Sequence, residues 1–191
     1  MKKIVISGIL SAVLSVSVFA GETQEKAVEI GQQASKKLLK TLVSELKKAM
    51  KEGGPYKAID VCSQKALKLT EKVSEEEGVQ IKRTTFKYRN PKNAPDKYEK
   101  EALEYFEKAL KEKGKLPEYY LQKVEGGYRY YMPLKVKHIC LTCHGDPQKM
   151  DKKLLEKIRS IYRDDKATGY REGDFRGVIR VFIPEKKLSE K

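Results

Sequence analysis

Hydrophobic residues recur every three or four positions along two early stretches of the chain, with lysine and glutamate between them. On one helical face the first stretch carries Ala27, Ile30, Ala34, Leu38, Leu42, Leu46 and Ala49. The second stretch begins near Tyr56 and carries on one face Ile59, Cys62, Ala66, Leu69 and Val73. This spacing predicts two amphipathic helices, ended by Gly53-Gly54-Pro55 and by Glu77-Gly78. The chain is therefore expected to begin as a helical hairpin.

Strand patterns appear only after this hairpin. The run GVQIKRTTFKYR is rich in β-branched and aromatic residues that roughly alternate with polar ones, which predicts a strand. Two aromatic-rich runs on either side of Glu125-Gly126-Gly127 predict a β-hairpin, and FRGVIRVFI predicts a final strand. Consecutive hairpin-like strands favour an antiparallel sheet.

Two further helices are predicted between these strands. The run RNPKNAP contains two X-Pro pairs and predicts an ordered loop. Asp96 and Glu99 then form a capping box for a helix that ends at Gly114. Another helix is expected from Asp151 to about Arg163. Helices at the amino end and between antiparallel strands indicate the α+β class.

The first 20 residues have the features of a cleaved signal peptide. MKK is a basic start, IVISGILSAVLSVSVF is apolar, and Val18-Phe19-Ala20 is a small-residue cleavage signal. The apolar run falls short of the roughly 20 residues that a spanning helix needs, so we expect no stable membrane span. We expect cleavage after Ala20, a periplasmic location, and one domain over residues 21–191.

The positive net charge of the chain indicates which classes of partner it could bind. The formal net charge is +14 and falls to +12 when Lys2 and Lys3 leave with the signal peptide. An exported protein does not meet nucleic acid, so a basic surface would face acidic proteins or anionic lipid. We expect a redox or signalling protein as partner and no nucleic acid.

Cys140, Cys143 and His144 stand together in the sequence CLTCHG. Zinc would need about four ligands, with Cys62 or His138 completing the set, but adjacent ligands such as Cys143 and His144 cannot easily turn to one metal. A thioredoxin-like redox pair would follow the first strand of a βαβ unit, and a simple disulfide leaves the histidine unexplained. In an exported chain, C-x-x-C-H is the attachment signal for c-type haem. We therefore predict one covalently attached haem c, with His144 as an iron ligand.

Haem iron has a second axial position. The side chains able to fill it are Cys62, Met50, Met132, Met150 and His138. His138 lies only six residues before His144 and would have difficulty reaching the opposite haem face. Cys62 is the cysteine left over after haem attachment, although a lone cysteine is commonly a small buried hydrophobe. Met132 is the rival, because methionine is a common ligand in electron carriers. The sequence alone leaves Cys62 and Met132 open.

Several other side chains near these motifs could either contact a haem or have a purely structural role. Haem propionates could be bound by Arg89, Asn90 and Asn93, but we favour a role in bracing the Pro-containing loop. An apolar haem wall is expected from Phe86, Tyr128 and Tyr130. Asp174 and Arg176 are expected to form a pair between the last turn and the last strand.

Four segments carry a family resemblance. AIDVCSQKA, RTTFKYRNPKNAPDKYE, YYMPLKVKHICLTCHG and ATGYREGDFRGVIRV occur in this order and closely resemble the family of c-type haem proteins with a PAS-like fold. Its members occur as free-standing exported proteins and as extracytoplasmic sensor regions of histidine kinases and chemotaxis receptors. The resemblance implies a PAS-like antiparallel sheet with a long N-terminal helical hairpin and flanking helices. It also implies iron bound by His144 on one side and, as in a soluble cyanobacterial member, by the cysteine of the AI-x-VC helix, here Cys62.

Two functions follow from a haem with these ligands. In the first, the protein is a redox or gas (CO/NO) sensor or haem-binding module with His/Cys axial ligation, in which reduction weakens the bond to Cys62. In the second, it is a periplasmic electron-transfer cytochrome whose basic surface docks acidic partners. We expect no enzymatic activity, because the sequence offers no distal base beyond His138.

Overall fold

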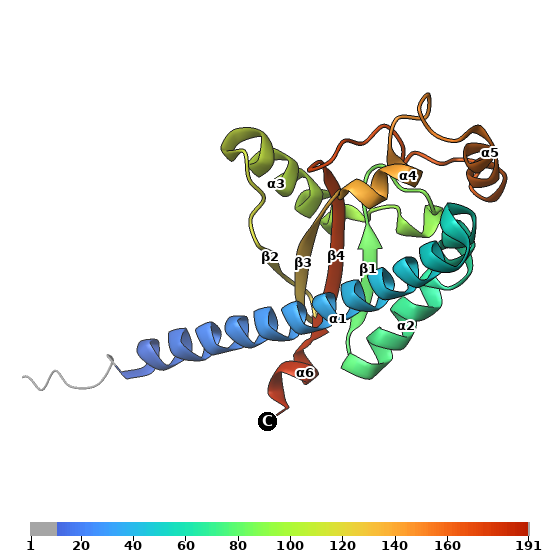
Figure 1. Ribbon diagram of the computed structural model, residues 1–191. Helices are drawn as coiled ribbons and strands as arrows, with labels where there is room; N and C mark the ends of the chain where they lie inside the picture. The colour runs from blue at the N-terminus through green and yellow to red at the C-terminus, as the bar shows by residue number, and fades with distance from the viewer. Residues whose placement is uncertain (1–10, 191) are drawn as a thin grey trace, which may run out of the picture.

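A long helix crosses one face of a four-stranded antiparallel sheet in the computed structural model, which describes residues 11–190 (Figure 1). The strand order is β1-β4-β3-β2. The strands are β1 (Gln80–Thr84), β2 (Tyr120–Val124), β3 (Gly127–Lys135) and β4 (Phe175–Pro184). All three neighbouring pairs are antiparallel, and Ile179 of β4 lies between Arg83 of β1 and Met132 of β3. The predicted α+β class with an antiparallel sheet is confirmed.

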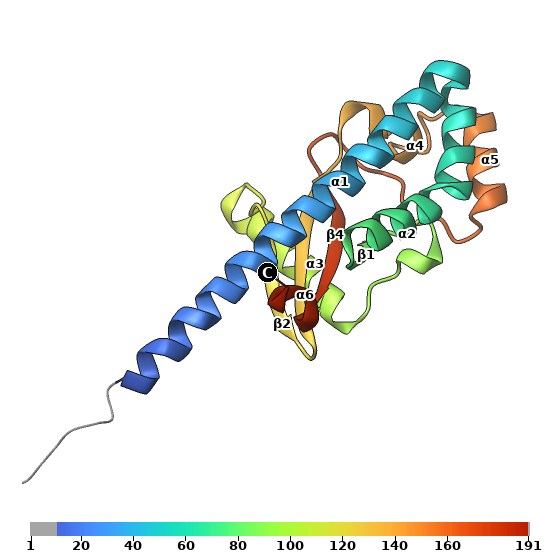
Figure 2. The ribbon, with the colours of Figure 1, turned by 90° about the horizontal axis from the view of Figure 1, so that it is seen from below.

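Helices cover both faces and one end of this sheet. The larger ones are α1 (Ser11–Gln64), α2 (Ala66–Glu77), α3 (Lys97–Lys113) and α5 (Lys152–Ile161). The short ones are η1 (Pro91–Asn93), η2 (His138–Cys140), α4 (Leu141–His144) and α6 (Glu185–Ser189). Figure 2 shows α1 lying across the strands with its second part, α4 and α5 gathered at one end of the sheet.

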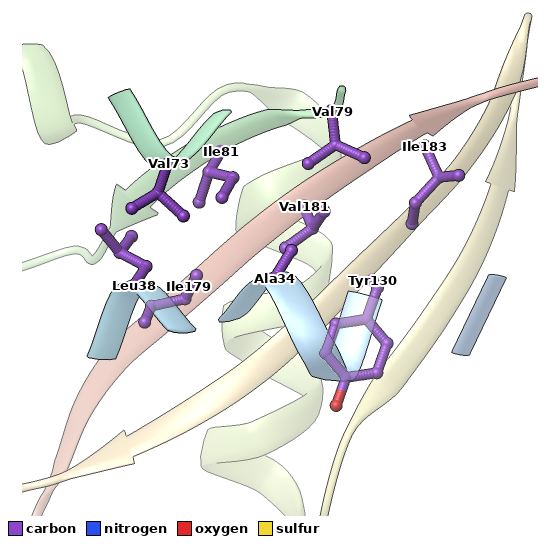
Figure 3. Packing of buried hydrophobic residues seen from close by; sticks show 9 residues of the cluster. All are labelled: Ala34, Leu38, Val73, Val79, Ile81, Tyr130, Ile179, Val181 and Ile183. Carbon is purple, nitrogen blue, oxygen red and sulfur yellow. The ribbon is translucent and has the colours of Figure 1, made fainter. Parts of the chain in front are cut away.

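The main core lies between α1, α2 and one face of the sheet. Side chains alternate along β4, so that Ile179, Val181 and Ile183 all point toward the helices (Figure 3). They pack with Ala34, Leu38, Val73, Val79, Ile81 and Tyr130. On the opposite face, α3 packs Leu103 and Phe106 against Tyr131 and Val178. The strands thus separate two helical layers, which leaves the ends of the sheet free for other segments.

The predicted helical hairpin is present, but its second helix is divided into residues 55–64 of α1 and the separate helix α2. Gly53 and Gly54 leave helical geometry, with φ of −160° and +62°, and the chain is helical again at Pro55. The second part of α1 packs through Ile59 against Leu154 and Ile158 of α5. The break therefore turns the chain back and brings its second helical part to the end of the sheet where α4 lies (Figure 1).

Most predicted boundaries agree with the structure. The capping box of Asp96 and Glu99 and the end of α3 at Gly114 are confirmed. The hairpin between β2 and β3 is also confirmed, whereas α6 was not predicted. Residues 1–10 of the expected signal peptide lie outside the described residues, and its cleavage stays a prediction. Within residues 11–190, no helix combines the length and the apolar character needed to cross a membrane.

Candidate functional site

A cavity at the α4 end of the sheet brings together cysteine and histidine side chains from two segments that lie far apart in the sequence. Cys62 reaches it from the second part of α1, Cys140 from the end of η2, and Cys143 and His144 from α4. Leu46, Met50, Ala58, Ile59 and Ile139 contribute apolar surface to the same cavity. A groove farther along α1, lined mainly by α1 residues and tyrosines, contains no cysteine or histidine. The cavity is therefore the candidate site.

The turn that carries Cys143 and His144 is fixed by the backbone around it. Gly145 donates its N–H to Leu141 O at 2.8 Å, and a side chain at Gly145 would place its Cβ only 2.6 Å from that oxygen. Tyr170 N donates to His144 O at 3.0 Å, and Gly169 N donates to Gly145 O at 2.7 Å. The glycine after the histidine is thus a steric requirement of α4, and the segment before β4 holds α4 in place.

His144 presents one ring nitrogen to the cavity in a defined state. Its Nδ1 lies 2.7 Å from Ala167 O, and a carbonyl oxygen only accepts, so Nδ1 carries the proton. Burial and then the positive charges of Arg89 and Arg176 hold the pKa of His144 well below its usual value. The imidazole is therefore neutral, with the lone pair on Nε2. This is the form in which histidine binds a metal.

The Arg89 side chain holds the turn of α4 in place through hydrogen bonds. Its Nη2 donates to Cys143 O at 2.6 Å, and its Nε and Nη2 contact the carboxylate of Asp165 at 3.1 and 3.0 Å. Both side chains of this ion pair are nearly inaccessible to solvent. The guanidinium therefore ties the start of the RNPKNAP loop to α4 and to the loop after α5, in agreement with the favoured bracing role.

Cys62 faces the cavity instead of packing into a core. Its side chain is exposed to the cavity, while Ile59, one turn earlier in α1, is buried against α5. The surrounding protein is still dense enough that burial raises the pKa of the Cys62 thiol, with Arg83 and Arg89 opposing the effect. The interpretation of Cys62 as a small buried hydrophobe is therefore wrong, and its sulfur is available to a group in the cavity.

The other candidate ligands lie mostly elsewhere. Met132 packs against the main core, where its Sδ lies 3.5 Å from Ser35 Oγ. His138 projects into solvent near Glu172, and Met150 packs against the contact between α1 and α5. Met50 alone of this group lines the cavity. The structure thus removes Met132, which the sequence had left open beside Cys62, and leaves Met50 as the methionine of the cavity.

Comparison with known proteins agrees with this architecture. A family model described as Tll0287-like matches residues 14–184. The chain belongs to the Tll0287-like family. Its structure is also similar to the crystal structure of the cyanobacterial haem protein Tll0287, with a TM-score of 0.61 and 28% sequence identity. The similarity covers 86% of this chain and 96% of that one. A comparison with curated proteins found no match to the chain.

Two sequence-based expectations for this Tll0287-like protein are corrected by the structure. Phe86, Tyr128 and Tyr130 do not line the cavity: Phe86 packs near α3, and both tyrosines lie toward the other end of the sheet. Aromatic character alone did not show which end of the sheet each ring occupies. Arg176 does not pair with Asp174, whose carboxylate accepts from Arg171 N at 2.7 Å; its own side chain lines the cavity instead.

The sequence interpretation also missed Arg83 and Tyr162, which line the cavity beside Cys62. A usable signal existed for Arg83. It stands two positions after Ile81 in β1, so period-two alternation places both on the face that packs against α1. A charged residue on the buried face of a strand is a marker for a polar site.

The donor set fits a haem better than a bare metal ion. In residues 11–190, no three His, Cys, Asp or Glu side chains are close enough together to hold an ion. The cavity instead contains one imidazole and one separate thiol that could bind the iron of a haem, and two further thiols at η2 and α4 that could attach its ring. Apolar walls and polar groups share the remaining surface, as an amphipathic ring with carboxylates requires.

Proposed function

We propose that this Tll0287-like protein binds one haem c, attached covalently through Cys140 and Cys143, with His144 and Cys62 as axial ligands. The observation that carries the proposal is the position of Cys62, which reaches the cavity of CLTCHG from a distant helix. The similarity to the crystal structure of a cyanobacterial haem protein supports the binding of haem. We further propose that the protein acts in the periplasm after loss of residues 1–20.

Each residue of the site has a defined task in this proposal. His144 offers Nε2 to iron because Ala167 O holds the proton on Nδ1. Cys62 offers a soft sulfur donor from the second part of α1. When bound, haem supplies an iron that exchanges one electron and accepts an axial ligand or a small gas. Cys140 and Cys143 fix the ring, so that changes at the axial position do not release it.

The leading function is a redox or gas sensor. A thiolate stabilises ferric iron and bonds ferrous iron more weakly, so reduction would loosen Cys62 and open its position to CO or NO. Cys62 stands on the second part of α1, which is joined to the first part through the break at Gly53 and Gly54. Release of Cys62 would thus free a helical segment to move, which is a local trigger of the kind that sensors use.

An alternative function is electron transfer in the periplasm. The observation in its favour is the positive charge, +14 for the full chain and +12 after loss of Lys2 and Lys3, which suits weak, salt-sensitive docking on an acidic redox partner. This function requires a ligand set that changes little between the two oxidation states. In either function the protein binds a partner protein, and we propose no enzymatic activity.

Optical spectra of the oxidised, reduced and CO-treated protein distinguish these functions. A sensor with a labile Cys62 gives a six-coordinate ferric spectrum that changes on reduction and shifts again with CO. An electron carrier keeps both ligands after reduction and does not bind CO. A protein purified without any haem absorbance, after expression with a haem-attachment system, would contradict both functions.

A further inference from the structure

Two guanidinium groups in the cavity lack an acidic partner. Arg83 and Arg176 both line it, and neither takes part in any ion pair among residues 11–190. The guanidinium of Arg83 also makes no side-chain hydrogen bond within this part of the chain, although its backbone belongs to the β1–β4 ladder. The third cavity arginine, Arg89, is neutralised by Asp165. The cavity therefore contains two uncompensated positive charges.

Two cations on the other face of the sheet, by contrast, do have an acidic partner. Lys82, next to Arg83 in β1, points to the opposite face and contacts the buried Glu99 at 2.6 Å. Arg180, farther along β4 from Arg176, pairs with the same carboxylate at 3.3 Å. The face that carries α3 thus pairs its cations with a carboxylate, and the cavity leaves its own two unpaired.

Both unpaired guanidinium groups are partly buried by the surrounding protein. Arg176 lies over the ring of Tyr170 at 5.2 Å and donates to Lys87 O at 3.2 Å. Burial lowers the pKa of Arg83 and of Arg176, and for Arg83 the charge of Arg176 adds to the effect. Removing two like charges from water without a counter-charge is unfavourable. An anionic occupant would relieve this cost.

The number of unpaired positive charges in the cavity indicates which anion it binds. If the proposed function is right, Cys62 serves the iron and its thiolate is compensated there. Two guanidinium groups then match two carboxylates, and the fork of an arginine binds a carboxylate through two parallel hydrogen bonds. We infer that Arg83 and Arg176 form the carboxylate-binding pair of the cavity and hold the two haem propionates. This inference rests on the proposed function.

The two arginines come from neighbouring strands of the sheet, Arg83 from β1 and Arg176 from the start of β4. Both line the cavity that contains Cys62 and His144. Two such cations can each bind one carboxylate of the same ring and so help to orient it. Arg83 and Arg176 are accordingly positioning residues, and Asn90 is less suited to the task because its side chain is neutral and cannot balance the charge of a carboxylate.

The test compares haem-loaded Arg83→Gln, Arg176→Gln and the double variant with the unchanged protein. Arg159→Gln is the matched control, because Arg159 is exposed on α5 and does not line the cavity. Resonance Raman spectroscopy reports the propionate bending band, which shifts when a hydrogen bond to a propionate is lost. We expect a shift in both single variants, a larger one in the double variant and none in Arg159→Gln. The reduction potential should fall with each lost cavity charge.

Two outcomes would overturn the inference. The first is an unchanged propionate band in the double variant. The second is an Arg83 variant that alters only the bands of the axial ligands, which would assign Arg83 to the thiolate of Cys62. If a glutamine variant fails to fold, Arg83→Lys and Arg176→Lys keep the charge and should shift the band while largely preserving the potential. The intact mass of each protein distinguishes failure of this inference from failure of the proposed function. An unmodified chain without covalent haem would contradict the proposed function itself.

Discussion

Cys62 is the residue on which the chemistry of the cavity depends most. It opens onto the same space as His144, although both come from helices whose other residues pack into cores. Its closest rival in the structure is Met50, the methionine that shares this cavity. A thiolate favours ferric iron and a thioether favours ferrous iron, so the identity of the sulfur decides which oxidation state the site stabilises.

Substitution of Cys62 should change the ligand field of the iron. Cys62→Ser removes the soft donor at nearly constant size, and we expect loss of the thiolate-type low-spin ferric signal in electron paramagnetic resonance. Cys62→Met supplies a neutral sulfur, and the midpoint potential should rise in a redox titration. Met132→Leu is the control and should change neither, because Met132 lies outside the cavity. Loss of the low-spin signal in Met50→Leu, with an unchanged Cys62→Ser, would assign the ligand to Met50.

Arg89 should contribute strongly to the stability of the folded protein. Replacing it with glutamine leaves Asp165 buried without its partner and Cys143 O without its donor. Removal of one member of a buried ion pair costs about 3 to 5 kcal/mol, and urea unfolding of the haem-free chain measures it. Lys157→Gln is the control, because its half-exposed pair with Asp60 should contribute at most about 1 kcal/mol. Equal losses in the two variants would show that Arg89 does not brace the site.

At the scale of elements, the features that depend on a few adjacent residues could be predicted from the sequence. The capping box at Asp96, the end of α3 at Gly114 and the turn at Glu125-Gly126 each depend on a few adjacent residues, and all are present. The break at Gly53 and Gly54 was also visible in the sequence. Its consequence was not, because the angle between the two parts of α1 is set by packing against the sheet and α5.

The contact between α1 and the sheet should be sensitive to one methyl group. A Cβ at Gly31 would lie 2.3 Å from Cγ of Tyr130, which is fully buried. Gly31→Ala should therefore destabilise the protein by about 1 to 3 kcal/mol despite the higher helix propensity of alanine. Thermal unfolding measures the effect, with Lys40→Ala as an exposed control on the same helix. A stabilised Gly31→Ala variant would mean that α1 does not approach the sheet this closely.

The start of α3 should respond to acid. Burial alone would raise the pKa of Asp96, but hydrogen bonds from Glu99 N and Arg129 outweigh it and lower the pKa. A lowered folded-state pKa gives stability that is present above the unfolded value of about 3.9 and is lost as the pH falls through the folded value. Asp96→Ala should cost about 1 kcal/mol at neutral pH. Unfolding measurements should show this difference shrinking below about pH 4; a difference independent of pH would exclude the carboxylate as its source.

At the scale of the whole molecule, the sequence predicts the class of fold and the haem motif, while the cavity itself depends on long-range packing. CLTCHG is contiguous and could be interpreted directly. Arg83, Tyr162 and Arg176 reach the cavity from a strand, a helix end and the start of another strand. Their convergence follows from the antiparallel pairing of β1 with β4 and from the return of the chain at Gly54. No local pattern encodes such a meeting of segments.

The central claim is that this cavity holds a covalently bound haem, and intact mass spectrometry tests it most directly. The protein is expressed with its first 20 residues in a host that attaches haem to exported chains, and is then extracted with acidified acetone. We predict a chain that begins at Gly21 and carries the mass of one haem, retained after extraction. Replacement of Cys140 and Cys143 together by serine should abolish the retained haem. A chain recovered without haem, or one that loses its haem to the solvent, would contradict the claim.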